Sequence, residues 1–397
     1  MNPAAFTEIS PLIRGMSAKN MNPCMVRYLK NRELYRSLND SDSAVLVLDP
    51  KGGNLEEQLL RAVETFGSES GGFPRAILTG SEDVYITGRD WDDIAGVLSG
   101  GEKDPLQPAQ DRRERDRNRL VENRICLVTG AAQGFGEGIA RSLAEGGAFV
   151  ALADLNVEGA AKVADDINSR QGRVTSRAYA MNVTDEESVR EAVTSLTEEA
   201  GGIDLLISNA GVLKAGSVKE LAYKDFQFVT GVNYAGFFLC AKHFAPVMAR
   251  QNRGLLAAAG YPYYTDIVQI NSKSGLEGSN KNGAYAGSKF GGIGLVQSFA
   301  LELVEDNIKV NAVCPGNFFD GPLWSDPEKG LFRQYLDAGK VEGAETVADV
   351  KAYYEAKVPM NRGCSVEDVM TAVLYLVDQK YETGQALPVT GGQVMLR

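Results

Sequence analysis

Apolar residues in the second two-thirds of the chain form short continuous runs that alternate with stretches of helical spacing. The first run covers residues 125–128, a helical stretch follows at 138–146, and the next run covers 149–153. Further strands are expected at 178–181, 205–208, 267–271 and 309–312, with helical stretches between them. Apolar strands that alternate with helices are typical of a parallel sheet covered on both faces. The pattern therefore predicts an α/β fold with a doubly wound parallel sheet.

The first hundred residues show a second and shorter pattern. It predicts helices at 25–38, 55–66 and 90–98, and strands at 44–48, 75–79 and 84–87. A polar stretch then ends in a run of mixed charge at 111–119, which we interpret as a solvated linker. We therefore divide the chain into a small α/β domain of unknown role at 1–100, a charged linker at 101–119 and a larger α/β domain at 120–397.

Composition and charge exclude several classes of protein. The length of 397 residues suits two domains, and 44% hydrophobic with 23% charged residues is ordinary for a globular protein. The net charge of −11 disfavours nucleic acid as a partner. No apolar run is long enough to span a membrane, and the first 14 residues lack the core of a signal peptide, so we expect a cytoplasmic protein. Five scattered cysteines and the single His243 show no metal-ligand spacing, so no metal site is expected.

A glycine-rich segment at 129–136 lies between the first strand and the first helix of the larger domain. Gly130, Gly134 and Gly136 allow a tight turn, and the N–H groups of the helix that follows would face a pyrophosphate. Asp154 ends the second strand, where a carboxylate binds ribose hydroxyls and repels a 2′-phosphate. The glycine segment contains no Arg or Lys. These features predict a Rossmann-type dinucleotide site that takes NAD rather than NADP.

A second set of residues carries the chemistry of hydride transfer. Tyr285 and Lys289 are one helical turn apart and share a face. A free phenol has a pKa of roughly 10, and a nearby ammonium lowers it. The phenol can then exchange a proton with a substrate oxygen while hydride moves to or from nicotinamide. Ser272 follows a predicted strand and can hydrogen-bond the reacting oxygen, and Asn233 lies on a helix where its amide can hold a proton-relaying water.

Two further turns follow strands in the same order, Asn209-Ala-Gly211 and Pro315-Gly316. From about residue 120 to the end, these motifs together resemble the short-chain dehydrogenase/reductase family. The resemblance implies that Tyr285 is the acid/base, that Lys289 lowers its pKa and holds the nicotinamide ribose, that Ser272 orients the substrate and that Asn233 supports the proton relay. It also implies a cofactor site made of Gly130, Gln133, Gly134, Phe135, Gly136, Asp154, Asn182, Val183, Asn209, Ala210, Gly211, Tyr285, Lys289, Pro315 and Gly316.

Two positions depart from the pattern of that family. Asn182 stands where an acidic residue is usual, and we expect its amide oxygen to hydrogen-bond adenine. Asn271 stands where a serine is more usual, next to Ser272, and we expect this change to have no effect.

Within the family, four segments resemble the sorbitol-6-phosphate 2-dehydrogenases, which oxidise sorbitol 6-phosphate to fructose 6-phosphate with NAD; the segments are 267–275, 285–295, 358–364 and 389–395. A phosphosugar needs cations near the mouth of the pocket. The candidates are Lys273 and Lys214, ahead of Arg362. The segment 317–357 corresponds to the region that closes over the substrate in this family, and such a lid excludes water.

Two alternative functions stay open at this stage. One is a dehydrogenase of an unphosphorylated polyol or another secondary alcohol. The other is a nonenzymatic NAD(H)-sensing protein, because fold alone does not imply activity. The complete set of Ser272, Tyr285 and Lys289 favours an enzyme. The only partner expected besides a small-molecule substrate is the chain itself, as a homo-oligomer and preferably a tetramer, which the family commonly forms through two long helices and the last strand.

Overall fold

The larger part of the chain forms one parallel sheet. The structure, a computed structural model, describes residues 5–17, 24–39, 44–49, 54–80, 82–100, 104–107, 120–259, 263–337, 339 and 341–395. Seven strands pair in the order β11-β10-β9-β8-β5-β6-β7, and every pairing is parallel. The strands are β5 (Ile125–Thr129), β6 (Phe149–Asp154), β7 (Ser176–Ala180), β8 (Leu205–Ser208), β9 (Thr265–Ile270), β10 (Ile308–Pro315) and β11 (Ala386–Val389).

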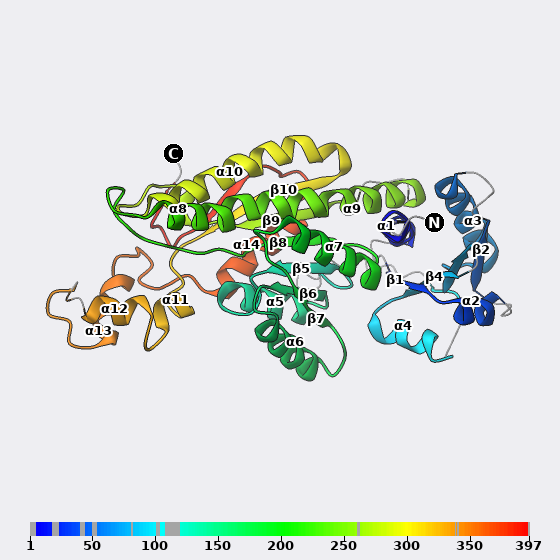
Figure 1. Ribbon diagram of the computed structural model, residues 1–397, viewed down its shortest axis with the longest axis horizontal. Helices are drawn as coiled ribbons and strands as arrows, with labels where there is room; N and C mark the ends of the chain where they lie inside the picture. The colour runs from blue at the N-terminus through cyan, green and yellow to red at the C-terminus, as the bar shows by residue number, and fades with distance from the viewer. Residues whose placement is uncertain are drawn as a thin grey trace.

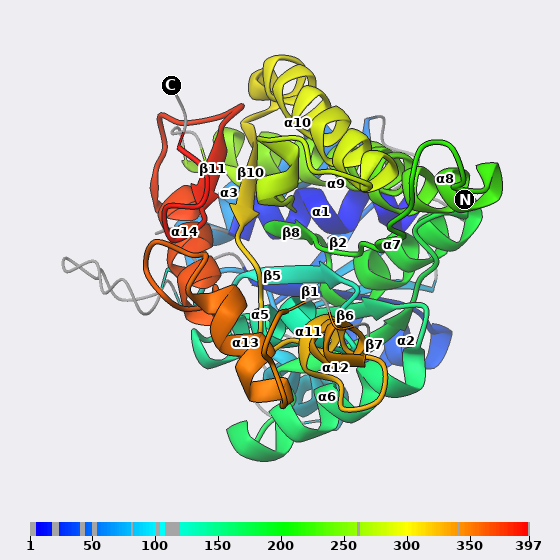
Figure 2. The same ribbon diagram turned by 90° about the vertical axis from the view of Figure 1, so that its left-hand side faces the viewer.

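Helices cover both faces of this sheet, as Figure 2 shows. One face packs against α5 (Gly134–Glu145), α6 (Val157–Gln171) and α14 (Val366–Asp378). The other packs against α7 (Glu186–Ala200), α9 (Gly236–Ala259) and α10 (Gly283–Leu303). Side chains of β5 alternate between the two cores: Leu127 points to the α7 side and Val128 to the α5 side. The predicted doubly wound parallel sheet is confirmed, and β11 is a short edge strand that the sequence pattern did not predict.

The N-terminal residues form a separate, four-stranded sheet in the order β1-β4-β3-β2. Its elements are α1 (Ala5–Ser17), β1 (Met25–Lys30), α2 (Arg32–Asn39), β2 (Val45–Leu48), α3 (Leu55–Ser70), β3 (Ala76–Thr79), β4 (Asp83–Gly88) and α4 (Trp91–Leu98). The predicted helix at 25–38 is wrong in its first half, because residues 25–30 pair antiparallel with β4. Tertiary pairing decides such a short, ambiguous apolar segment. Helix α1 was not predicted.

The two sheets share a hydrophobic core. Trp91 of α4 stacks on Phe149 of β6 with ring centroids 5.8 Å apart, and the guanidinium carbon of Arg177 lies 4.1 Å from the centroid of the Trp91 ring. Of the predicted linker, residues 104–107 are described, and Leu106 is buried and pairs with Phe73. The charged run at 111–119 lies outside the described residues. The division of the chain at about residue 100 stays a prediction.

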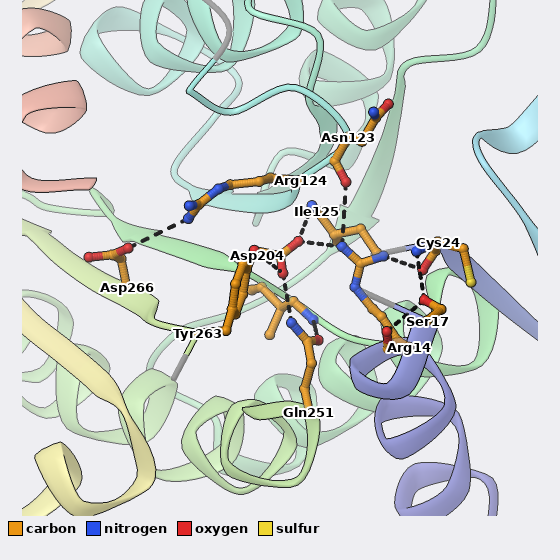
Figure 3. Close-up of polar contacts among 11 residues, drawn as sticks. Arg14, Ser17, Cys24, Asn123, Arg124, Ile125, Asp204, Gln251, Tyr263 and Asp266 are labelled. Atoms are coloured by element: carbon orange, nitrogen blue, oxygen red, sulfur yellow. Dashed lines mark hydrogen bonds and ion pairs between the residues drawn. The ribbon is translucent and has the colours of Figure 1, made fainter. Parts of the chain in front are cut away.

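Helix α1 inserts a buried arginine at the base of the parallel sheet (Figure 3). Arg14 forms an ion pair with Asp204, just before β8, and both side chains are 0% exposed. Asp204 also accepts hydrogen bonds from the backbone N–H of Ile125 at 2.6 Å, from Gln251 Nε2 at 2.6 Å and from the Tyr263 hydroxyl at 3.1 Å. The N-terminal segment is therefore bound to the amino ends of the strands.

Candidate active site

The candidate site lies at the opposite edge of the sheet, where the parallel strands end. The predicted cofactor residues other than Tyr285 and Lys289 lie at the carboxyl ends of β5, β6, β7, β8 and β10 or just after them, and Ser272 follows β9. In a doubly wound sheet, ligands bind outside the carboxyl ends of the strands. In Figure 1 the N-terminal sheet lies at one end of the long axis of the molecule. The helices between residues 322 and 355 lie at the other end.

The glycine turn after β5 has the shape that a close backbone approach requires. Gly130 and Gly134 have φ values of 66° and 63°, a region that favours glycine. A Cβ on Gly136 would lie only 2.0 Å from the carbonyl oxygen of Gly130, so any side chain there would break the turn. Gln133 precedes α5 without a side-chain hydrogen bond to the helix. The first N–H groups of α5 are therefore left for an anion.

The two polar residues expected on the adenosine side are tied to the backbone. Asp154 accepts hydrogen bonds from the N–H of Ala132 at 2.9 Å and of Asn156 at 2.8 Å, which fixes the carboxylate beside the glycine turn. The amide oxygen of Asn182 accepts from the N–H of Thr184 at 3.1 Å and from its hydroxyl at 2.8 Å. Adenine would have to share that oxygen with Thr184.

Thr129, which the sequence analysis did not single out, joins two of the predicted turns. Its buried hydroxyl accepts hydrogen bonds from the N–H groups of Asn209 at 3.0 Å and Ala210 at 2.9 Å. Asn209 Nδ2 in return donates to the carbonyl oxygens of Thr129 at 3.0 Å and Gly130 at 3.1 Å. A hydroxyl residue at the end of an otherwise apolar strand was the only signal in the sequence.

Tyr285 and Lys289 lie on one face of α10, as their spacing predicted. Lys289 Nζ lies 5.6 Å from the centroid of the Tyr285 ring and donates to the carbonyl oxygen of Ile270 at 2.9 Å. Burial raises the pKa of Tyr285, and a hydrogen bond with Ser272 opposes this rise. The net shift is upward, opposite to the direction expected from the Tyr–Lys spacing, because desolvation outweighs the stabilisation of the phenolate. Burial also lowers the pKa of Lys289 to about 8.

Replacing Lys289 by methionine should remove a pH dependence of stability. In the folded protein the Lys289 ammonium has a pKa of about 8. In the unfolded chain the pKa of a lysine is roughly 10.4. From pH 8 upward the unfolded state holds more protons, so this group makes the wild type more stable as the pH rises. Urea unfolding measures the free energy of unfolding of the wild type and of Lys289→Met. Between about pH 7 and 9.5 the difference between the two should change in favour of the wild type. A difference that is constant over this pH range would contradict the lowered pKa of the buried Lys289.

Asn233 lies in a π-helical turn, η3 (Gly231–Ala235), between α8 (Tyr223–Thr230) and α9. Such turns occur often at functional sites. The buried amide accepts from the N–H of Val212 at 2.8 Å and donates to its carbonyl oxygen at 2.9 Å and to Ser288 Oγ at 3.1 Å. Ser288, a second residue that we did not single out, donates to the carbonyl oxygen of Tyr285 at 2.7 Å. The predicted proton relay stays a prediction, and the contacts show Asn233 holding the turn after β8 against α10.

The predicted lid segment carries three helices, α11 (Pro322–Ser325), α12 (Leu331–Asp337) and α13 (Val347–Glu355), which lie together at one end of the molecule in Figure 1. They enclose an aromatic core in which Phe319, Trp324 and Phe332 contact one another. Phe318 stacks on Phe135 of the glycine turn with ring centroids 4.3 Å apart. The segment is therefore packed on the predicted cofactor site.

The three candidate phosphate ligands differ in their surroundings. Lys214 is exposed, whereas Lys273 is half-buried, and burial lowers the pKa of its ammonium. Arg362 already has a partner: its Nη2 donates to Asp368 Oδ1 at 2.8 Å. It lines an open cavity of about 370 Å³ together with Gly316. Arg362 thus lies near the Pro-Gly turn but with its guanidinium engaged.

Within the described residues there is no group of three or more His, Cys, Asp or Glu side chains placed to hold a metal ion. Among the helices that the structure describes, none is long and apolar enough to cross a membrane.

The sequence profile described as short chain dehydrogenase matches residues 124–324. Sorbitol-6-phosphate 2-dehydrogenase of Escherichia coli (strain K12) is 36% identical over 275 residues, which is 69% of this chain and 99% of that protein. The 3-oxoacyl-[acyl-carrier-protein] reductase FabG of Thermotoga maritima is 30% identical. The match covers 69% of this chain and 99% of that protein. Among solved structures, sorbitol-6-phosphate 2-dehydrogenase SrlD from Erwinia amylovora superposes with a TM-score of 0.61 at 38% identity, over 68% of this chain and all of that one.

Proposed function

Because this chain belongs to the short-chain dehydrogenase/reductase family of oxidoreductases, we propose that it interconverts sorbitol 6-phosphate and fructose 6-phosphate with NAD(H). The observation that carries the proposal is the resemblance along two-thirds of the chain to two sorbitol-6-phosphate 2-dehydrogenases, at 36% and 38% identity. The support for NAD is Asp154, whose carboxylate is fixed beside the glycine turn and would repel a 2′-phosphate.

The glycine turn fits a dinucleotide. Its glycines leave no side chain between the backbone and a pyrophosphate, and the first N–H groups of α5 would bind the phosphate oxygens. Asp154 would accept hydrogen bonds from the adenosine ribose, and Lys289 would hold the nicotinamide ribose. The nicotinamide supplies the hydride acceptor in one direction and the donor in the other.

Tyr285 would exchange the proton that accompanies the hydride. In reduction, the phenol O–H bond breaks and the proton goes to the oxygen of the former ketone. In oxidation, the substrate hydroxyl returns its proton to the phenolate. Ser272 would hold that oxygen through its hydroxyl. Because burial raises the pKa of Tyr285, the phenol is protonated at neutral pH. The protonated phenol is the state that can donate the proton in reduction.

The experiment that tests the proposal is oxidation of NADH with fructose 6-phosphate, compared with fructose and with NADPH. We expect fast turnover only with the phosphorylated ketose and NADH. Equal turnover with fructose would replace the substrate by an unphosphorylated polyol, and equal turnover with NADPH would overturn the role of Asp154. NADH binding without turnover of any ketose would favour a sensing protein.

The phosphate site is tested in the same assay by Lys273→Gln and Lys214→Gln. Each variant should raise the KM for fructose 6-phosphate by about 10- to 150-fold, which corresponds to loss of a charged hydrogen bond worth roughly 1.5–3 kcal/mol. Lys219→Gln, an exposed lysine near Lys214, is the matched control and should leave the KM unchanged. If the control and the two variants behave alike, the phosphate is bound elsewhere, and Arg362 becomes the first candidate.

We also propose that the protein acts in the cytoplasm as a homo-oligomer, with a tetramer favoured. Apolar side chains remain exposed on the first half of α9 and on α10, including Phe238 at 43%, Phe290 at 47% and Leu301 at 82%. The second half of α9 is covered by α1. The two helices are so close that a Cβ on Gly254 of α9 would lie 2.6 Å from the carbonyl oxygen of Leu12 of α1. Sedimentation equilibrium would give the number of subunits directly.

A further inference from the structure

Asn271 lies between the strand end that carries Ser272 and the helix that carries Lys289. Its side chain is buried, with 4% of its surface exposed. The amide oxygen accepts a hydrogen bond from the backbone N–H of Ser272 at 2.9 Å. The amide nitrogen donates to the carbonyl oxygen of Lys289 at 2.9 Å and to Gln269 Oε1 at 2.8 Å. Both ends of this amide are therefore used.

A second hydrogen bond ties Lys289 to the same strand end. Lys289 Nζ donates to the carbonyl oxygen of Ile270 at 2.9 Å, so the main chain and the ammonium of Lys289 both contact residues 270–271. The strand end is itself fixed, because the N–H of Asn271 donates to the carbonyl oxygen of Val313 in β10 at 2.7 Å. One short segment thus sets where Ser272 and Lys289 lie relative to each other.

Two glycines provide the space for this amide. A Cβ on Gly275 would lie 2.2 Å from Asn271 Oδ1, and a Cβ on Gly292 would lie 2.6 Å from Gln269 Nε2 and 3.1 Å from Asn271 Nδ2. Neither glycine has a positive φ. The missing side chain, and not an unusual backbone, is therefore what the structure requires at both positions.

We propose that Asn271 is a positioning residue that fixes Ser272 and Lys289 in their catalytic arrangement, an inference that rests on the roles proposed above for those two residues. A side chain the length of serine is too short to contact both the Ser272 N–H and the Lys289 carbonyl oxygen. Displacement of catalytic groups by about 1 Å costs on the order of 100-fold in rate. We therefore expect a change of Asn271 to lower turnover through these two residues, in place of the neutral effect expected from the sequence.

The test compares Asn271→Ala with Asn252→Ala, a matched change of a buried asparagine on α9 that contacts the opposite end of β9. Asn252 is 1% exposed, and its Nδ2 donates to Thr265 Oγ1 at 2.9 Å and to the carbonyl oxygen of Asp306 at 2.9 Å. Both variants should lower the melting temperature to a similar extent. Only Asn271→Ala should lower kcat, by about tenfold or more, with little change in KM. Equal kcat losses in the two variants, or a wild-type kcat in Asn271→Ala, would overturn the proposal.

A second readout needs no substrate and so separates this inference from the proposed reaction. For each protein, the ultraviolet difference spectrum between that protein and its Tyr285→Phe counterpart reports ionisation of the Tyr285 phenol. Since the hydrogen bond with Ser272 lowers the pKa of Tyr285, moving Ser272 should shift that titration to higher pH in Asn271→Ala and not in Asn252→Ala. Asn271→Ser takes the place of the alanine variant if the latter does not fold. An unchanged titration would overturn the positioning role even if fructose 6-phosphate proves not to be the substrate.

Discussion

Replacing Arg14 by methionine should lower the free energy of unfolding by about 3–5 kcal/mol, the usual cost of removing one partner of a buried ion pair. Methionine keeps much of the volume of the arginine stem but leaves the carboxylate of Asp204 buried without its ion pair (Figure 3). Arg14 also donates to the carbonyl oxygen of Cys24, so the loss would loosen the start of β1 as well. Urea denaturation monitored by tryptophan fluorescence measures the change.

The matched control is Arg250→Met. Arg250 of α9 forms an ion pair with Glu8 of α1 at 3.3 Å and so also holds α1, but the two side chains are 33% and 62% exposed. An exposed pair contributes less than about 1 kcal/mol. The free energy of unfolding could fall by the same amount in both variants, or Arg14→Met could be as stable as the wild type. Either result would mean that the buried pair does not hold the N-terminal segment to the sheet.

Replacing Tyr285 by phenylalanine should reduce kcat by about 10²–10⁴-fold, the range for loss of a positioned proton donor. The ring and its packing on α10 stay in place, and the proton for the substrate oxygen is lost. The Kd for NADH should stay close to that of the wild type, because the glycine turn and Asp154 are untouched. Stopped-flow turnover and fluorescence titration with NADH give the two quantities.

Tyr375→Phe is the control for this change. Tyr375 lies on α14, is 46% exposed and donates to Glu382 Oε2 at 2.6 Å, away from the predicted site. Its variant should keep full turnover. Substantial activity in Tyr285→Phe would mean that another group delivers the proton, and a large loss of NADH affinity would mean that the phenol binds the cofactor more than it reacts.

Local patterns in the sequence were enough to predict the parallel sheet and most of its strands. A strand of the sheet is a short apolar run, and its partner helices follow within a few residues, so the pattern repeats along the chain. The glycine turn at Gly130–Gly136 and the spacing of Tyr285 and Lys289 are local for the same reason. The structure brings all the predicted catalytic residues to the carboxyl edge of the sheet, because parallel strands end on one side.

Contacts between distant parts of the chain could not be predicted in this way. Arg14 and Asp204 are 190 positions apart, and nothing near either residue in the sequence indicates the other. The same holds for the strand β1, which antiparallel pairing with β4 selects over a helix.

The sequence by itself determined the fold of the C-terminal two-thirds of the chain, and it predicted the glycine turn and the candidate reacting side chains, because each depends on residues that are neighbours along the chain. Only the tertiary structure decided the environment of those side chains. Burial raises the pKa of Tyr285 and lowers that of Lys289, and Asn271 joins Ser272 to Lys289 in a space left by two glycines. Desolvation and packing depend on everything that surrounds a group, and most of that surrounding comes from elsewhere in the sequence.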